Sequence, residues 1–270
     1  MRSALAPVIL GLPGWLHRLV GKSGANPNAI PYAANFVRDE YWSGGRLIRG
    51  FANVPAHSYT RAGTRYASTA GGVLLPFAAN VARRTDKGLK VDAGATNLIP
   101  YSEFANGLAD LSFSAGLVAA VSLSDFGPFA TGLSFGYAAA TVSYAYRTVT
   151  LTAVPWAFSV FLKMDDGNPP AFGHSSGSNI ANDFCFAIGD QRPSPNAYTI
   201  TPLANGVYRV SGTTTPPAGA GDIGVLKYAT NSARTFKVTG YQIELGAVAT
   251  DYIPTAGSAA AAGLDSFALT

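Results

Sequence analysis

Glycine and proline interrupt this chain at short intervals, and no other feature of the sequence constrains its fold as strongly. The 270 residues include 30 glycines and 17 prolines, which are spread along the whole length. The segments between these breaks are short and rich in valine, tyrosine, phenylalanine and threonine, residues that favour strands. The pattern therefore predicts many short strands joined by turns.

Eight segments after residue 96 are the clearest predicted strands. They are 117–123, 140–152, 157–163, 183–188, 197–201, 207–214, 222–228 and 236–245. Residues 207–214 alternate in polarity with the period of a half-buried strand. Residues 240–255 predict a strand that runs into a turn, with Gln242 and Glu244 on its polar face. Because no strong helical pattern separates these segments, we expect an all-β fold, an antiparallel jelly-roll β-sandwich.

Changes in composition and regularity along the sequence divide the chain into four parts. Residues 1–55 are irregular and predict an extended N-terminal anchor, and residues 56–96 predict a small β-hairpin lead-in. Residues 97–257 hold the predicted sandwich, and residues 258–270 begin as an alanine-rich, low-complexity tail. An apolar run at 4–16 follows Met1 and Arg2, but prolines and glycines interrupt it and no Ala-x-Ala site follows, so it is not a typical signal peptide. It is also too short to cross a membrane.

Positive charge is concentrated in the first third of the chain. Residues 1–96 hold 12 Lys and Arg against 4 Asp and Glu, whereas residues 97–270 hold 7 against 11. This basic region either docks on an acidic partner or is a solvated face without one. Its arginines are dispersed, which makes nucleic acid an unfavoured partner. For docking onto an assembly we expect the anchor residues Trp15, Leu16, Arg18, Arg38, Tyr41 and Trp42.

The sequence shows no convincing catalytic or metal-binding constellation. The three histidines lie in different regions, and Cys185, the only cysteine, lies between two phenylalanines as a core thiol would. Asp165 and Asp166 form a carboxylate pair next to a turn, which could serve glycoside hydrolysis or hold calcium. Adjacent residues in a turn point apart, so we expect no enzyme activity, no cofactor and no metal.

Aromatic residues are the more suggestive feature. Tyrosine and tryptophan stack on sugar rings while the polar tip still forms hydrogen bonds. The aromatic residues in or near predicted strands are Tyr137, Tyr144, Tyr146, Trp156, Tyr198 and Tyr228. Most such rings fill cores, but several candidates remain for a glycan site: Tyr198, Trp156, Phe172, His174 and Asn196.

Four segments, in order, resemble a domain found in many bacteriophage tail and fibre proteins. Residues 97–104 (NLIPYSEF) resemble its opening N-L-L-x-Y-S-E-D-F, and residues 157–163 (AFSVFLK) resemble its strand Y-T-F-S-V-Y-L-K-A. Residues 205–211 (NGVYRVS) are similar to N-G-W-Y-R-V-S, with Val207 in place of tryptophan. Residues 240–255 (GYQIELGAVATDYIPT) resemble the closing signature G-A-Q-L-E-x-G-x-x-x-T-S-Y-I-P-T. The lead-in is also similar, although Ala95 replaces an arginine of the family.

The resemblance implies a jelly roll like that of carbohydrate-binding modules and a place on the virion, assembled in the bacterial host cytoplasm. It implies a fibre, spike or decoration protein that docks on capsid, portal or tail through its N-terminal arm, often as a homotrimer. Three functions follow: a virion protein that binds host-surface glycan, a purely architectural virion protein, and, least favoured, a polysaccharide-degrading tailspike enzyme. No membrane insertion is expected.

Overall fold

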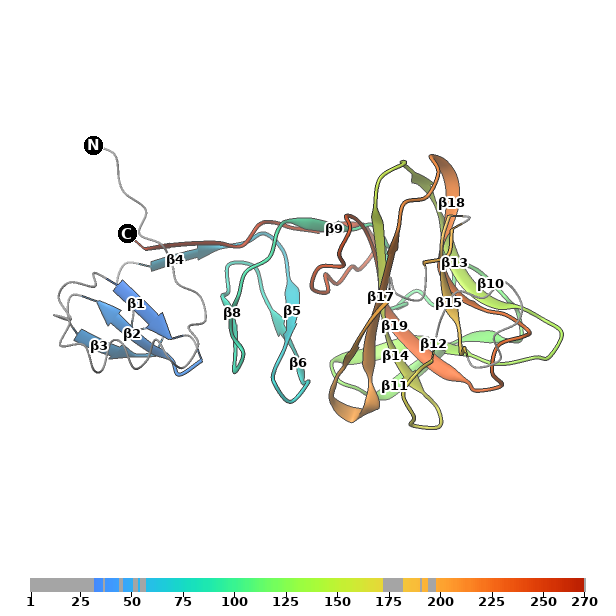
Figure 1. Cartoon of the computed structure of the whole chain (residues 1–270), viewed down its shortest axis with the longest axis horizontal. Coiled ribbons are helices and arrows are strands. Elements are labelled where there is room, and N and C mark those ends of the chain that lie inside the picture. Colours follow the sequence, from blue (N-terminus) through green and yellow to red (C-terminus); the bar gives the residue numbers. More distant parts are fainter. Residues whose placement is uncertain are drawn as a thin grey trace.

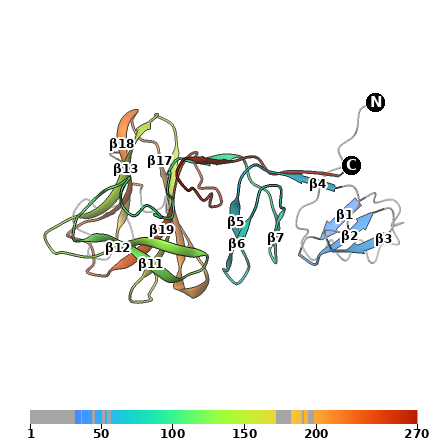
Figure 2. The ribbon, with the colours of Figure 1, turned by 180° about the vertical axis from the view of Figure 1, so that it is seen from behind.

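The chain folds into three parts that follow one another in space (Figure 1). They are a small sheet, a stalk made of residues 57–96 and 258–269, and a sandwich. The same order appears from the opposite side (Figure 2). The computed structural model describes residues 32–35, 37–43, 46–50, 53, 57–171, 182–189, 191–193 and 198–269. No helix in these ranges is long and apolar enough to span a membrane.

The sandwich consists of a six-stranded and a four-stranded antiparallel sheet. The larger has the order β11-β12-β19-β14-β17-β16 and the smaller the order β10-β13-β18-β15. The strands of the larger are β11 (Val118–Phe126), β12 (Phe129–Phe135), β19 (Phe236–Leu245), β14 (Trp156–Met164), β17 (Tyr208–Thr214) and β16 (Tyr198–Pro202). Those of the smaller are β10 (Ser112–Phe113), β13 (Ser143–Leu151), β18 (Gly219–Lys227) and β15 (Cys185–Ile188). A short 3-10 turn, η4 (Ala204–Gly206), precedes β17.

This topology confirms the predicted jelly roll. The chain passes from β12 in the larger sheet to β13 in the smaller, returns to β14, and keeps alternating through β15, β17, β18 and β19. Such alternation interleaves two antiparallel sheets, as in a jelly roll. All eight predicted strands are present, and the two that the sequence did not predict are β10 and β12.

One apolar core fills the space between the two sheets. Phe158, Phe186 and Tyr241 meet there edge to face, with ring centroids 4.7 and 5.0 Å from Phe158. β14 and β19 lie in the middle of the larger sheet, and nearly every residue of both is buried. Strands that are buried on both faces need a cover on the outer face as well.

The stalk provides part of that outer cover. Phe161 projects from β14 on the side opposite the core and packs with Phe129 and Tyr252. Tyr66 and Leu74, which belong to a stalk hairpin, pack against the same cluster. The outer face of the six-stranded sheet is therefore turned toward the stalk, and the outer face of the four-stranded sheet is turned away from it (Figure 1).

The two most distinctive sequence motifs meet in a clasp, which we define as residues 97–103 and 250–255. Asn97 is fully buried and uses all of its hydrogen-bonding groups. Its Nδ2 donates to the carbonyls of Tyr241 (3.0 Å) and Ile253 (2.9 Å). Its Oδ1 accepts from the N–H groups of Ile99 (3.1 Å) and Ile243 (3.2 Å). One side chain thus ties β19 to the segment that follows it.

Hydrogen bonds of Ser102 and Thr255 close the other end of the clasp. The N–H of Ser102 donates to Thr255 Oγ1 (2.9 Å), and the N–H of Thr255 donates to Ser102 Oγ (2.9 Å). Ser102 Oγ also lies 2.6 Å from the hydroxyl of Tyr252. Burial and the nearby Glu103 raise the pKa of Tyr252 well above its usual value.

The predicted polar face of residues 240–255 exists, but it is buried. Gln242 Oε1 accepts from the N–H of Ile253 (2.7 Å), and Gln242 Nε2 donates to Glu244 Oε1 (2.8 Å). Glu244 accepts from the N–H (2.7 Å) and the hydroxyl (2.8 Å) of Thr250. The chain folds back after β19, so these polar groups satisfy its backbone instead of facing water.

The stalk, defined as residues 57–96 and 258–269, consists of two-stranded antiparallel pairs. Two are hairpins, β5 (Arg65–Ser68) with β6 (Leu74–Phe77) and β7 (Arg83–Thr85) with β8 (Gly88–Lys90). In the other two, the C-terminal segment returns along the lead-in: β20 (Ala260–Ala262) pairs with β9 (Ala95–Asn97), and β21 (Ser266–Leu269) pairs with β4 (His57–Thr60). The lead-in thus contains two hairpins. Residues 260–262 and 266–269 of the expected low-complexity tail form strands, because they pair with residues about 165 and about 210 positions earlier in the chain.

A buried charged cluster joins the stalk to the sandwich. This junction cluster comprises Arg61, Arg65, Arg83, Asp92, Asp251 and Asp265. Arg83 lies 2.9 Å from Asp92 Oδ2 and 2.5 Å from Asp251 Oδ2, and it also pairs with Asp265. The guanidinium groups of all three arginines are fully buried. These arginines therefore serve the fold, so the expectation that they offer a basic face to an acidic partner is wrong.

The region before the stalk contains a small sheet. β1 (Tyr32–Asn35), β2 (Glu40–Ser43) and β3 (Arg46–Arg49) form an antiparallel meander in the order β1-β2-β3. Residues 32–35, 40–43 and 46–49 thus form strands within the region that the sequence predicts to be an extended, irregular anchor. An ion pair of 2.6 Å between Asp39 and Arg84 connects this part to the stalk.

Candidate functional site

The outer face of the four-stranded sheet carries a group of aromatic and polar side chains. Ala145 of β13 is buried in the core, so its neighbours Tyr144 and Tyr146 project from the opposite face. Tyr228, just after β18, packs with Tyr144 around Leu226 on the same side. We name this surface the tyrosine face and define it by Tyr144, Tyr146, Thr148, Arg192, Asp222 and Tyr228.

Two of the tyrosines form a stacked pair. The ring centroids of Tyr144 and Tyr146 are 5.2 Å apart and the rings are 26° from parallel. Both rings are half-buried, and the floor next to them consists of the buried side chains of Cys185, Ala187 and Leu226. The stacked pair therefore lies beside an apolar floor. Burial raises the pKa of Cys185 in this floor to about 11, so its thiol stays protonated at neutral pH.

A glycine next to Tyr146 is required by close strand packing. Gly224 lies opposite Tyr146 on β13 and opposite Ala187 on β15. A Cβ atom on Gly224 would lie 2.2 Å from the carbonyl oxygen of Ala145 and 2.5 Å from the Cα of Tyr146. Because backbone atoms occupy the space, no side chain can project from position 224 on the outer face of β18, between Asp222 and Leu226.

Polar groups border the aromatic rings. Thr148 Oγ1 donates to Asp222 Oδ1 (2.7 Å), across the β13–β18 pair. Arg192 Nε donates to the hydroxyl of Tyr228 (3.3 Å), and its Nη1 donates to the carbonyl of Gly189 (3.2 Å). Hydroxyl, carboxylate and guanidinium groups therefore lie around an amphipathic aromatic surface.

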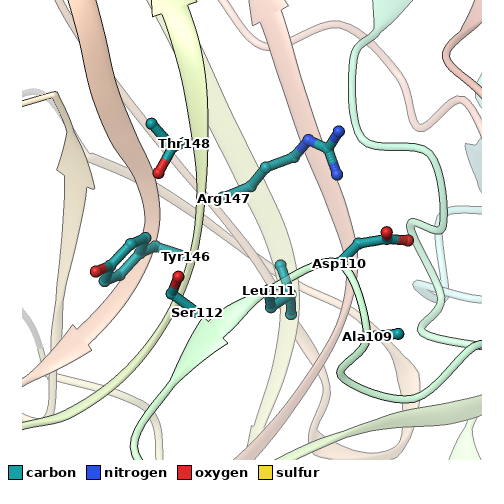
Figure 3. A pocket seen from close by; sticks show the side chains of 7 residues that line it. All are labelled: Ala109, Asp110, Leu111, Ser112, Tyr146, Arg147 and Thr148. Atoms are coloured by element: carbon teal, nitrogen blue, oxygen red, sulfur yellow. The ribbon is translucent and has the colours of Figure 1, made fainter.

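A hollow opens at the edge of this face, where β10 ends. Its volume is about 370 Å³, and it is lined by Ala109, Asp110, Leu111, Ser112, Tyr146, Arg147 and Thr148. Figure 3 shows Tyr146 and Thr148 on one side of β13 and the side chains of Arg147 and Asp110 on the other. β10 pairs only with Ala145 and Tyr146, so β13 has no strand on this side from Arg147 onward. Tyr146 therefore borders the hollow from the face of β13 that carries the stacked rings, whereas the two charged side chains border it from the other side of the strand.

This combination of groups suits a sugar better than a reaction. Sugar recognition needs an aromatic surface and a few convergent polar groups. Within the described ranges, no three or more His, Cys, Asp or Glu side chains gather in a way that could hold a metal ion.

The carboxylate pair considered for catalysis or calcium is occupied by cations. Lys237 pairs with Asp165, and Thr235 Oγ1 donates to the same carboxylate (2.6 Å). Arg234 binds Asp166 with both Nε (2.7 Å) and Nη2 (2.8 Å). These hydrogen bonds lower the pKa of Asp166, so it stays ionised in a salt bridge. Neither residue has the free carboxylate that a glycosidase or a calcium site requires.

The glycan candidates that can be placed belong to the core. Trp156 is 3% exposed, and its Nε1 donates to the carbonyl of Thr152 (3.1 Å). The Tyr198 ring packs on Phe186 at 5.3 Å, and its hydroxyl accepts from the N–H of Phe186 (2.8 Å). Burial raises the pKa of Tyr198. The expectation that these two rings face a ligand is corrected, while Phe172, His174 and Asn196 lie outside the described residues.

The anchor candidates are only partly visible. Tyr41 is completely buried, so it supports the β1–β3 sheet and does not present a free side chain. Arg38 is exposed, and Trp42 lies in β2. Trp15, Leu16 and Arg18 lie outside the described residues. A docking role for the exposed members stays a prediction.

The charged members of the site had no signal in the sequence. Tyr144 and Tyr146 alternate with a small residue in a predicted strand, and this period is enough to place both rings on one face. Asp110 precedes β10, a strand that the sequence did not predict. Asp222 became a member of the tyrosine face only through the β13–β18 pairing, and Arg147 lines the hollow beside it.

Comparisons with known proteins find a distant structural similarity. The sequence matches no protein-family model, and no curated protein sequence matches it. A CBM22-1 xylan-binding domain from Paenibacillus barcinonensis Xyn10C is 13% identical and covers 59% of this chain and 100% of its own, with a TM-score of 0.37. The CBM22-1–GH10 modules of a Clostridium thermocellum xylanase, solved with xylohexaose, are 11% identical over 59% of this chain and 30% of theirs (TM-score 0.37). A CBM22-2 xylan-binding domain of the Paenibacillus enzyme is 10% identical over 56% and 98% (TM-score 0.35). At TM-scores this low, the ligand of this chain has to be inferred from its own residues.

Proposed function

We propose that this chain is a structural protein of a bacteriophage virion, assembled in the bacterial host cytoplasm, whose sandwich binds a host-surface glycan. In this proposal the N-terminal part docks on capsid, portal or tail, and the stalk holds the sandwich away from the particle. The tyrosine face is the binding surface. The place on a virion is supported by the resemblance of residues 97–104 and 240–255 to tail and fibre proteins.

One observation carries the glycan assignment: the tyrosine face lies on the sheet that is turned away from the stalk. The stalk packs on the outer face of the six-stranded sheet through Tyr66 and Leu74, so the opposite outer face points outward. The β1–β3 sheet and the β4–β21 pair lie at the other end of the molecule (Figure 1). In this proposal, an aromatic surface with polar neighbours faces away from the part that docks on the particle.

A second function is supported by a different observation. Asn97, Ser102, Gln242 and Glu244, which belong to the resembling motifs, all form clasp contacts. These motifs therefore account for the fold without any ligand. A purely architectural virion protein is the alternative that this observation supports.

Binding of the full chain to an array of bacterial surface glycans would separate the two functions. Glycan binding should weaken at least tenfold in Tyr146→Ala, because a central aromatic contact contributes about 2 kcal/mol. Tyr101→Ala is the matched control, because Tyr101 is half-buried beside Gly257, outside the tyrosine face. Circular dichroism checks that both variants fold. No binding by the folded wild type would favour the architectural function, and equal binding by both variants would show that the ligand sits elsewhere.

A further inference from the structure

Arg147 differs from the other arginines whose side chains the structure describes. Each of the others forms at least one hydrogen bond or ion pair. The guanidinium of Arg147 forms neither with any described residue, although the side chain is half-buried where it lines the hollow beside β10. A guanidinium carries only N–H donors and no acceptor. The donors of Arg147 are therefore available to a molecule that occupies the hollow.

Asp110 supplies acceptors to the same hollow. Its side chain and that of Arg147 lie on the same side of β13 (Figure 3), but the two do not form an ion pair with each other. Asp110 is exposed, and its Oδ2 accepts from Asn106 Nδ2. Its Oδ1 has no partner among the described residues, and neither has the hydroxyl of Ser112, which also lines the hollow. The hollow thus offers a carboxylate oxygen, a hydroxyl and a guanidinium to a ligand.

The open edge of β13 adds backbone groups beside the hollow. The N–H of Ser114 donates to the carbonyl of Tyr144 (3.0 Å), so the backbone groups of Tyr144 face the β10 side. Because this direction alternates along a strand, those of Thr148 face the same side, beyond the end of β10. Asp222, which lies opposite Thr148 on β18, turns its carbonyl away and accepts from the N–H of Gly189 (2.8 Å). The N–H and C=O of Thr148 therefore face the open edge instead of β18.

We propose, building on the glycan-binding function proposed above, that the hollow is a subsite for one uncharged sugar unit whose neighbouring hydroxyl groups bridge Asp110 and Arg147. A hydroxyl group both donates and accepts hydrogen bonds. It therefore donates to the carboxylate while it accepts from the guanidinium. The two charges of the lining cancel, so an acidic sugar would be repelled by Asp110 and a cationic amino sugar would be repelled by Arg147.

The size and position of the hollow fit this role. Its volume of about 370 Å³ lies near the lower end of small-molecule sites, which begin at roughly 300 Å³, so it suits a single sugar unit. Tyr146 borders the hollow and also belongs to the stacked pair with Tyr144. A glycan chain that places one unit in the hollow thus continues past Tyr146 onto the tyrosine face. In this arrangement the rings supply the stacking surface, and the hollow selects the charge of the sugar.

Binding of the full chain to immobilised bacterial surface polysaccharides of known composition tests the subsite. The wild type should prefer polysaccharides of neutral sugars over those with uronic acids or free amino sugars. Asp110→Asn and Arg147→Gln should each weaken binding to the neutral class by roughly fivefold or more, because each removes a charge-assisted hydrogen bond. Asp110→Asn should also strengthen binding to the uronic acid class, since only the cation then remains.

The matched controls are Asp125→Asn and Lys163→Gln, which remove the same charges from a surface ion pair of the six-stranded sheet. Both should bind like the wild type. Wild-type binding that neither Asp110→Asn nor Arg147→Gln weakens, or a wild-type preference for charged sugars, would overturn the subsite and leave the tyrosine face as the binding surface. A folded wild type that binds no polysaccharide would overturn the proposed function together with the subsite.

Alkylation of an introduced cysteine keeps the test decisive if a charge variant does not fold. Cys185, the only native cysteine, is 1% exposed and will not react. Ser112→Cys places an exposed thiol in the lining of the hollow, and Val154→Cys places one on the sandwich outside it. A saturating neutral polysaccharide should largely abolish the reaction of iodoacetamide with Ser112→Cys and leave Val154→Cys unchanged. Equal reaction rates of Ser112→Cys with and without bound polysaccharide would show that the hollow stays empty.

Discussion

Asp265 offers the sharpest test of how the stalk is held together. Its carboxylate has no solvent exposure and accepts hydrogen bonds from the Tyr59 hydroxyl, the Arg83 guanidinium and the N–H of Asp92 (2.8 Å). Arg61 Nη1 lies 3.5 Å away. We expect Asp265→Asn to remove the carboxylate that pairs with the buried Arg61 and one of the three carboxylates that pair with Arg83, at an almost unchanged side-chain volume.

The expected loss can be worked out from these contacts. The three hydrogen bonds to the Asp265 carboxylate involve a charged group, and each is worth about 1.5–3 kcal/mol. Breaking a buried ion pair costs about 3–5 kcal/mol. We therefore expect Asp265→Asn to lower the free energy of unfolding by about 4 kcal/mol. For a chain of this size that corresponds to a drop of roughly 10 °C in Tm.

Urea unfolding followed by circular dichroism measures this loss. The control is Asp125→Asn, because the Asp125 carboxylate is 53% exposed and pairs with Lys163 at the surface. Such a pair contributes about 0–1 kcal/mol. If Asp265→Asn lost no more stability than Asp125→Asn, the view that the buried charges of the junction cluster hold the stalk together would be refuted.

The pH dependence of stability provides a second test of Asp265. Burial would raise the pKa of Asp265, but hydrogen bonds from Tyr59, Asp92 and Arg83 hold it below the usual 3.8. The stabilisation is thus present above pH 3.8 and is lost as the pH falls through the lower value of the folded state. Asp265→Asn should remove this part of the acid sensitivity.

Two further predictions concern buried polar groups of the sandwich. Burial lowers the pKa of Lys227 to about 8, so between pH 8 and the usual 10.5 the unfolded chain binds more protons than the folded chain. Stability to urea should therefore rise from pH 8 to 9.5 in the wild type, and an equal rise in Lys227→Met would contradict this assignment. Asn97→Ala should cost about 3–5 kcal/mol, because it leaves two buried carbonyls and two N–H groups unpaired. The control in the same urea titration is Asn106→Ala, because Asn106 is half-buried and its side chain donates to the surface residue Asp110. Comparable losses would show that the clasp does not depend on Asn97.

Local sequence patterns predicted most of the sandwich. The alternation of apolar residues and the turn residues between segments are properties of neighbouring positions, and they located all eight predicted strands. β12 was missed because residues 129–135 contain glycine and alternate poorly. The two-residue alternation of a strand also places Tyr144 and Tyr146 on the same face. The sequence could therefore predict the aromatic part of the site.

The prediction that Trp156 and Tyr198 face a ligand failed because aromatic type does not determine exposure. Trp156 is the first residue of the central strand β14. Tyr198 lies on the edge strand β16, and its ring packs on Phe186 of the core. Which face of a strand is covered depends on the sheet and the segments packed against it. That information is absent from the strand itself.

The sequence by itself determined the fold class, the strands of the sandwich and the hairpins of the lead-in, because each depends on residues close together in the chain. Only the tertiary structure decided the roles of the arginines and of the C-terminal segment. Arg61, Arg65 and Arg83 look dispersed until folding brings Asp251 and Asp265 to them from the other end of the chain. Likewise, residues 260–262 and 266–269 become strands only because β9 and β4 supply their hydrogen-bonding partners. Contacts between distant residues depend on the whole fold, and no local pattern records them.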